Sequence, residues 1–237
     1  MSKSSKLKLH KSNKLFFSEY LYKLVFRNEL NVIFRSDLQK KEKLSYARRE
    51  LDRLAEDYRN NFPLVKRAWR TDISIANNDY FDAMTVYSAL KHSNEYKLRI
   101  DPYSKITLFS NNKEFLVDLG SKLKTDTSEF WEPCANYVEL LQSKTKIQIV
   151  DEPTTLPLKV WFNSTRVNQD FASWIHANRD KCKIGKIALD SLENYGYMNG
   201  LYIYLRDDKV LSLVTLLAGA SIRSVEKLVY RGDIDKY

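Results

Sequence analysis

Apolar and polar residues alternate along several short segments of this chain, a pattern that predicts β-strands with one buried and one exposed face. The clearest alternation is at 20–27, 96–100, 158–162 and 201–205. Elsewhere, apolar residues recur every three or four positions, which predicts amphipathic helices. We therefore predict an α+β fold, in which β-hairpins form antiparallel or mixed sheets covered by helices.

The pattern predicts four β-hairpin-plus-helix (ββα) units. Their strand pairs are expected at 20–27 with 31–35, 96–100 with 105–109, 146–150 with 158–162, and 201–205 with 210–217. The first helix is expected to begin at a capping box formed by Ser36 and Gln39, and the last to carry Ile222, Val225 and Leu228 on one side. Units of this size cannot bury an apolar face alone, so they should pack together.

The expected domain organisation has three parts. Residues 1–14 are polar and rich in lysine, and are expected to form a basic flexible tail. Residues 15–142 form an N-terminal α+β lobe with two ββα units and one additional helix. Residues 143–237 form a C-terminal lobe with the other two units. Because no Pro/Gly/Ser-rich linker separates the lobes, a single compact domain is the alternative.

Positive charge is concentrated near the N-terminus. Residues 1–70 hold 18 basic and 8 acidic side chains, whereas residues 71–237 hold 21 basic and 22 acidic ones, and the whole chain of 237 residues has a net charge of +9. This asymmetry predicts a polyanionic partner, either a nucleic acid or an acidic protein surface. The alternative is a solubilising tail followed by a helix with a solvated charged surface.

Strand alternation also predicts a sheet face that combines cations with aromatic rings. Cations neutralise phosphates, and rings stack on unpaired bases, so this combination is typical of single-strand binding. The alternative is that the polar side of a one-sided sheet simply faces water. Together with a basic cluster at 66–70, the predicted nucleic-acid contacts are Lys23, Arg27, Lys66, Arg67, Trp69, Arg70, Lys97, Arg99, Lys159, Trp161, Tyr202, Tyr204 and Arg206.

Motifs for common enzyme chemistry are missing from the sequence. The six glycines are scattered, which excludes P-loop and dinucleotide-binding fingerprints, and the three histidines and two cysteines lack zinc-site spacing. No cofactor or metal is expected. One pattern resembles that of metal-dependent nucleases: Asp79 and Asp82 lie upstream of Glu95-Tyr96-Lys97. The absence of a long apolar segment and the scarcity of cysteine indicate an intracellular protein with no membrane partner.

These observations favour a non-enzymatic nucleic-acid-binding accessory protein. The Lys-, Asn- and Tyr-rich composition is typical of AT-rich genomes, including those of viruses and phages. The alternative is a structural or assembly protein of a virion or larger complex, with homo-oligomer formation expected, and the second alternative is a metal-dependent nuclease.

Overall fold

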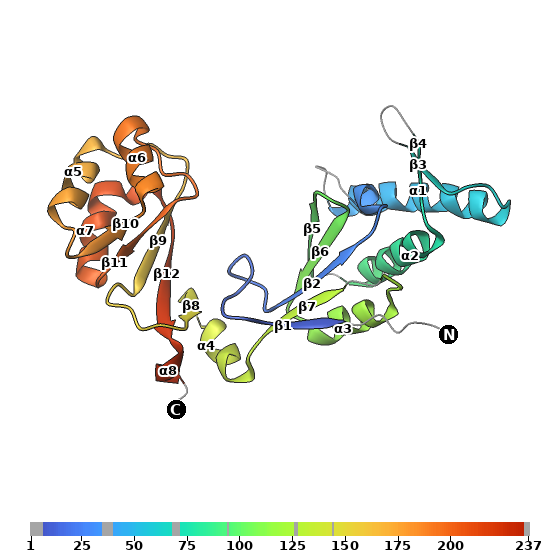
Figure 1. The fold of residues 1–237 in the computed structure, drawn as a ribbon, viewed down its shortest axis with the longest axis horizontal. Helices are drawn as coiled ribbons and strands as arrows, with labels where there is room; N and C mark the ends of the chain where they lie inside the picture. Colours follow the sequence, from blue (N-terminus) through green and yellow to red (C-terminus); the bar gives the residue numbers. More distant parts are fainter. Residues whose placement is uncertain are drawn as a thin grey trace. The chain divides into compact units, whose positions relative to one another are not determined.

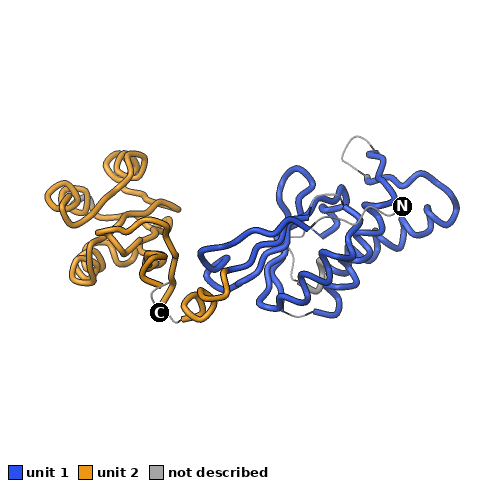
Figure 2. The backbone as a smooth tube through the Cα atoms, turned by 60° about the horizontal axis from the view of Figure 1, so that its bottom comes forward, with its two compact units in different colours: residues 1–133 blue, residues 134–237 orange. Residues whose placement is uncertain are grey.

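The computed structural model describes residues 7–34, 40–67, 72–93, 95–125, 128–143 and 145–234. The fold is α+β, as the sequence predicts (Figure 1). The chain divides into an N-terminal unit, residues 1–133, and a C-terminal unit, residues 134–237 (Figure 2). This division comes before the expected boundary at 142/143, because the short helix α4 (Val138–Leu141) contacts strand β8 (Ile147–Val150) of the C-terminal unit.

The N-terminal unit contains a mixed five-stranded sheet in the order β1-β7-β2-β6-β5. Strand β1 runs parallel to β7, and the other neighbours are antiparallel. The expected hairpin at 96–109 is confirmed as β5 and β6. The strands are β1 (Lys8–Ser12), β2 (Tyr22–Arg27), β5 (Lys97–Asp101), β6 (Lys105–Ser110) and β7 (Glu129–Pro133).

Three helices cover one face of this sheet: α1 (Lys40–Arg59), α2 (Asn77–His92) and α3 (Lys113–Lys122). Leu24 and Phe26 of β2 are fully buried in the same core as Leu51 and Leu54 of α1. The short strands β3 (Val65–Arg67) and β4 (Asp72–Ser74) form a separate two-stranded ribbon, which follows α1 and precedes α2 along the chain. The apolar positions that alternate along β2 therefore point toward the helices, and the charged positions point away from them.

The C-terminal unit contains a second mixed sheet, in the order β10-β11-β9-β12-β8. Strand β12 is parallel to β8, and the other neighbours are antiparallel. Val160, Phe162 and Ile203 pack in one core with residues of helices α5, α6 and α7. The remaining elements are β9 (Leu158–Phe162), α5 (Gln169–Ala177), β10 (Cys182–Ile184), α6 (Lys186–Tyr195), β11 (Tyr202–Leu205), α7 (Asp208–Ala218), β12 (Ile222–Tyr230) and α8 (Arg231–Ile234).

The two sheets have the same topology. If the strands of each five-stranded sheet are lettered A to E in chain order, both sheets have the order A-E-B-D-C, with A parallel to E and every other pair antiparallel. Strands B to E form a split β-α-β arrangement, to which strand A adds an edge. Helix α6 separates strands C and D of the C-terminal unit, where the N-terminal unit has a tight turn. The fold is thus repeated in tandem.

The first and third expected hairpins are not formed. Residues 31–34 form a 3-10 helix instead of a strand, because the side chain of Asn28 accepts the Leu30 N–H and turns the chain. Residue 35 and the capping box at 36–39 lie outside the described residues. In the third unit, β8 and β9 do not pair with each other, because β12 lies between them.

In the fourth unit, two elements have the opposite type to that expected. Residues 210–217 are helical in α7, where the Asp207 side chain caps the helix by accepting the Val210 N–H. Residues 222–229 are extended in β12. A register shift between Ile222 and Ser224 places Ile222 and Val225 on the same face of the sheet, which produces a three-residue spacing that imitates a helix.

The expectation of a flexible tail is wrong for residues 8–12. They form β1 and pair with β7 from Lys8–Glu129 to Ser12–Pro133. The alternation of lysine and leucine at 6–9 was the signal for a strand. Residues 1–6 lie outside the described part of the chain.

Candidate nucleic-acid interface

Four predicted contact residues come together on the side of the C-terminal sheet that the helices leave uncovered. We call Lys159, Trp161, Tyr202 and Tyr204 the aromatic face. Trp161 of β9 lies opposite Tyr202 of β11, and Lys159 lies opposite Tyr204. The ring centroids of Trp161 and Tyr202 are 4.7 Å apart and those of the two tyrosines 5.3 Å, with interplanar angles of 60° and 72°. These edge-to-face contacts order the rings as one platform.

Lys159 is enclosed by this platform. Its Nζ atom lies 4.2 Å from the ring centroid of Tyr202, 4.4 Å from that of Trp161 and 6.0 Å from that of Tyr204. The rings leave only 7% of the residue exposed, so Lys159 is on the predicted face but is not displayed there. Cation–π contacts of this kind hold the rings in place around a positive charge.

Two polar atoms on this face are buried without a hydrogen-bond partner among the described residues. They are Nε1 of Trp161 and Oε2 of Glu226, and Glu226 lies on β12 opposite Lys159. Burial, a hydrogen bond with Tyr202 and the negative charge of Glu226 raise the pKa of Tyr204. Tyr204 is therefore a neutral phenol at physiological pH, and the indole N–H of Trp161 is buried beneath the face rather than displayed on it.

Other cations adjoin the aromatic face. Lys183 of β10 lies opposite Tyr204 and is exposed. It is not among the predicted contacts, because a three-residue strand gives too short an alternation to recognise in the sequence. Arg206, which was predicted, immediately follows β11 and forms ion pairs with Asp180 and Asp207 at 3.8 and 3.2 Å.

The corresponding side of the N-terminal sheet is rich in cations. Its strands run in register, so the outward positions form rows across the sheet. We call the cations in these rows the basic face: Lys8, Lys23, Arg27, Lys97, Arg99 and Lys105. Two acidic residues, Glu129 and Asp101, share the outward positions. Lys8 is not among the predicted contacts, because residues 1–14 are expected to form a tail.

Lys23 occupies the middle of the basic face. Its Nζ atom lies 3.8 Å from the ring centroid of Trp131 and 4.9 Å from that of Phe16. Burial lowers the pKa of Lys23, although the carboxylate of Glu129 acts in the opposite direction. Arg99 forms an ion pair with Asp101 at 2.9 Å.

A loop of the chain covers the aromatic centre of the basic face. Phe16, Phe17 and Tyr20 contact the ring of Phe109. Phe109 is consequently 2% exposed. The strands of the basic face therefore expose cations, and the covering loop adds Phe17, which is 48% exposed and whose ring centroid lies 3.8 Å from Nζ of Lys97. The strands of the aromatic face expose rings.

The predicted cluster at 66–70 is only partly described. The Nζ atom of Lys66 donates to the backbone carbonyl of Glu29 at 2.8 Å, which ties the β3–β4 ribbon to the rest of the unit. The side chain of Arg67, together with Trp69 and Arg70, lies outside the described residues.

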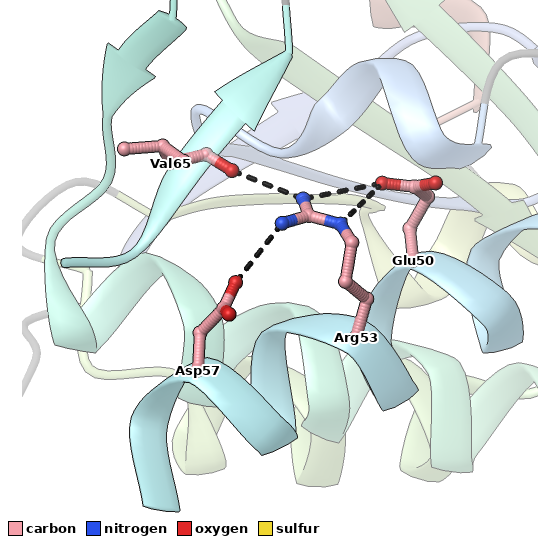
Figure 3. Close-up of polar contacts among 4 residues, drawn as sticks. All are labelled: Glu50, Arg53, Asp57 and Val65. Carbon is pink, nitrogen blue, oxygen red and sulfur yellow. Dashed lines mark hydrogen bonds and ion pairs between the residues drawn. The ribbon is translucent and has the colours of Figure 1, made fainter. Parts of the chain in front are cut away.

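The basic stretch along α1 contains internal ion pairs. Arg53 contacts Glu50 and Asp57 at 3.3 and 3.0 Å and donates to the carbonyl of Val65, as Figure 3 shows. Arg48 pairs with Asp52. Much of the positive charge of this helix is therefore balanced by its own carboxylates.

The carboxylates of the nuclease-like pattern have structural contacts. Both oxygens of Asp82 accept backbone N–H groups, from Lys124 at 2.7 Å and Thr125 at 2.9 Å, and burial raises the pKa of Asp82. Asp79 accepts the Glu29 N–H. Within the described ranges, no three His, Cys, Asp or Glu side chains are grouped to hold a metal ion.

Two further features complete the description of the surface. A cavity of about 500 Å³ between α2 and α3 is lined by residues that include His92, Phe115 and Asp118. Among the helices of the described segments, none is both long and apolar enough to cross a membrane.

No family model, no curated protein and no solved structure matches the chain, so its function has to be inferred from the geometry of these two faces.

Proposed function

We propose that the protein binds single-stranded nucleic acid without catalysis and that the aromatic face is its base-stacking platform. The observation that carries this proposal is the cluster of Trp161, Tyr202 and Tyr204 around Lys159 on one open sheet face. RNA-binding domains built on a four-stranded sheet stack about two or three bases on aromatic side chains of that sheet. Rings that are already ordered by their neighbours lose little conformational entropy when a base stacks on them.

Tyr202 is the best single position for a test. It is 37% exposed, the most accessible ring of the platform, so its removal is the least disruptive to the fold. A stacked base contributes about 1–3 kcal/mol, and Tyr202→Ala should therefore weaken binding by about 5- to 150-fold. Tyr202→Phe keeps the ring and should bind almost as well as the wild type.

Fluorescence anisotropy with a labelled oligonucleotide of about six nucleotides measures these affinities at two salt concentrations. The matched control is Tyr195→Ala, because Tyr195 is an exposed tyrosine on α6, in the helix layer of the same unit. We expect the control to bind like the wild type, and binding to weaken as salt rises. If Tyr202→Ala and Tyr195→Ala bind equally well while both remain folded by circular dichroism, the aromatic face is not the platform.

An assembly protein is the second candidate function, and one observation favours it. Ile187 on α6 and Leu216 on α7 are 76% and 83% exposed, more than any other large aliphatic side chain of the described residues, and a second subunit would cover them. Light scattering separates the two candidates. A stable homo-oligomer in the absence of nucleic acid favours assembly, whereas a monomer that changes mass only when an oligonucleotide is added favours strand binding.

A further inference from the structure

The two units repeat not only a topology but also the position of an enclosed lysine. Lys23 and Lys159 both lie on strand B of their sheet, and both point away from the helices. Aromatic rings approach Lys23 to 3.8 Å and Lys159 to 4.2 Å. The residue that lies opposite this lysine on strand D is aromatic in each unit: it is Phe109 in the N-terminal unit and Tyr204 in the C-terminal unit.

The two faces differ in what they leave accessible. On the N-terminal sheet, the loop that carries Phe16 and Phe17 covers Phe109, and Phe17 of this loop is itself 48% exposed. The accessible groups of the strands themselves are cations. Arg27 and Lys105 lie opposite each other on β2 and β6, and both are exposed. On the C-terminal sheet, the rings themselves are accessible. A phosphate requires an exposed cation, whereas a base requires an exposed ring.

We propose that the basic face is a second contact for the same single strand of nucleic acid. The basic face holds the phosphates of this strand, while the aromatic face stacks its bases. This inference rests on the function proposed above. The N-terminal unit ends at residue 133 and the C-terminal unit begins at residue 134, so the second contact is intramolecular once the first has formed. An intramolecular contact has an effective concentration of up to about millimolar when the nucleic-acid strand is long enough to reach both faces, so the affinity of a long strand should exceed that of a short one.

The test compares the full-length chain with two double variants that remove the same amount of charge. Arg27→Gln with Lys105→Gln removes two cations from the basic face. Arg48→Gln with Lys122→Gln removes two exposed cations from α1 and α3, in the helix layer of the same unit. Each protein is titrated with oligonucleotides of about 6 and about 30 nucleotides over a range of salt concentrations.

We expect the basic-face variant to bind the long strand more weakly and with a smaller dependence of log K on log salt. Each lost phosphate contact lowers that slope by about 0.7 for a single strand, so two lost contacts lower it by about 1.4. The helix-layer variant should keep the wild-type slope. Both variants should bind the short strand like the wild type, because the aromatic face alone can hold it.

Equal long-strand slopes for the two double variants would overturn this inference and leave the proposed function intact, provided that Tyr202→Ala still weakens short-strand binding. If Tyr202→Ala binds the short strand as tightly as the wild type does, the proposed function itself is overturned. A wild-type chain that binds long and short strands with the same slope also overturns the bivalent arrangement. Folding of each variant is verified by circular dichroism, so a misfolded protein cannot imitate a lost contact.

Discussion

Arg53 provides a direct test of the conclusion that the charges on α1 are structural. Its guanidinium joins two carboxylates of its own helix to the carbonyl of Val65 at the start of the β3–β4 ribbon (Figure 3). All three charged side chains are about one quarter exposed, between 25% and 28%. Arg53→Ala therefore removes both the internal charge balance and the contact between α1 and the ribbon.

The magnitude follows from these contacts. A hydrogen bond between a charged group and a carbonyl contributes about 1.5–3 kcal/mol, and each ion pair within a helix adds about 0.3–0.5 kcal/mol. Because the site is partly open to solvent, we expect the lower part of the sum, about 2 kcal/mol. Arg48→Ala is the matched control. Arg48 and Asp52 are 68% and 72% exposed and 3.6 Å apart, and their pair should contribute less than about 0.5 kcal/mol.

Urea unfolding followed by pulsed hydrogen exchange and mass spectrometry measures these free energies. The method detects peptides of the N-terminal unit separately from those of the C-terminal unit, so unfolding of one unit does not obscure unfolding of the other. With a urea slope of about 1–3 kcal/mol per molar, Arg53→Ala should lower the midpoint of the N-terminal unit by about 0.7–2 M. If Arg53→Ala and Arg48→Ala destabilise the unit equally, the network in Figure 3 has no special role.

Three further predictions concern buried or paired carboxylates. Asp82→Ala should destabilise the N-terminal unit by about 2–4 kcal/mol in urea unfolding, because two backbone N–H groups lose their acceptor, while Asp82→Asn, which keeps one acceptor oxygen, should cost less. The ammonium groups of Lys11 and Lys113 lower the pKa of Glu132. The ionised carboxylate therefore contributes fully to the stability of the folded unit above the unfolded-state pKa, and this contribution disappears as the pH falls through the folded-state pKa. In urea unfolding, the stability difference between wild type and Glu132→Gln should be present at pH 7 and vanish in strong acid. Glu226→Gln should tighten oligonucleotide binding in anisotropy titrations, because it removes a negative charge beside the aromatic face. Unchanged or weaker binding would contradict the proposal that the oligonucleotide lies on this face.

The sequence predicted the faces of the strands better than their partners. Alternation at 22–27, 158–162 and 202–205 depends only on which side of a strand meets the core, and the structure buries Leu24, Val160 and Ile203 as that pattern indicates. Pairing depends on residues that are distant along the chain, and nothing in 146–162 indicates that β12 lies between β8 and β9. The aromatic face could be predicted for the same reason, since its four residues lie on two strands with clear alternation.

Charge along the sequence was a less reliable guide than alternation. The excess of basic residues in the first 70 positions is real, but on α1 it is opposed by acidic residues one turn away. A linear count cannot distinguish Arg53, which holds the ribbon, from Arg27, which lies exposed at the end of β2. The structure separates them because helical spacing brings residues three or four positions apart into contact, whereas strand spacing directs neighbouring residues to opposite faces.

The repeated topology explains why two faces of different chemistry occur in one chain. A split β-α-β sheet covered by helices on one side fixes only the inward positions, which must be apolar, and leaves the outward positions without a packing requirement. The outward positions of two such sheets can therefore differ freely, and the enclosed lysine on strand B is the feature that both sheets retain. Enclosing a lysine desolvates its charge and lowers the pKa of Lys23, which opposes folding unless the neighbouring rings compensate. In both units a carboxylate on strand E lies beside this lysine, Glu129 in the N-terminal sheet and Glu226 in the C-terminal sheet, and its negative charge offsets part of the cost of burying the ammonium group.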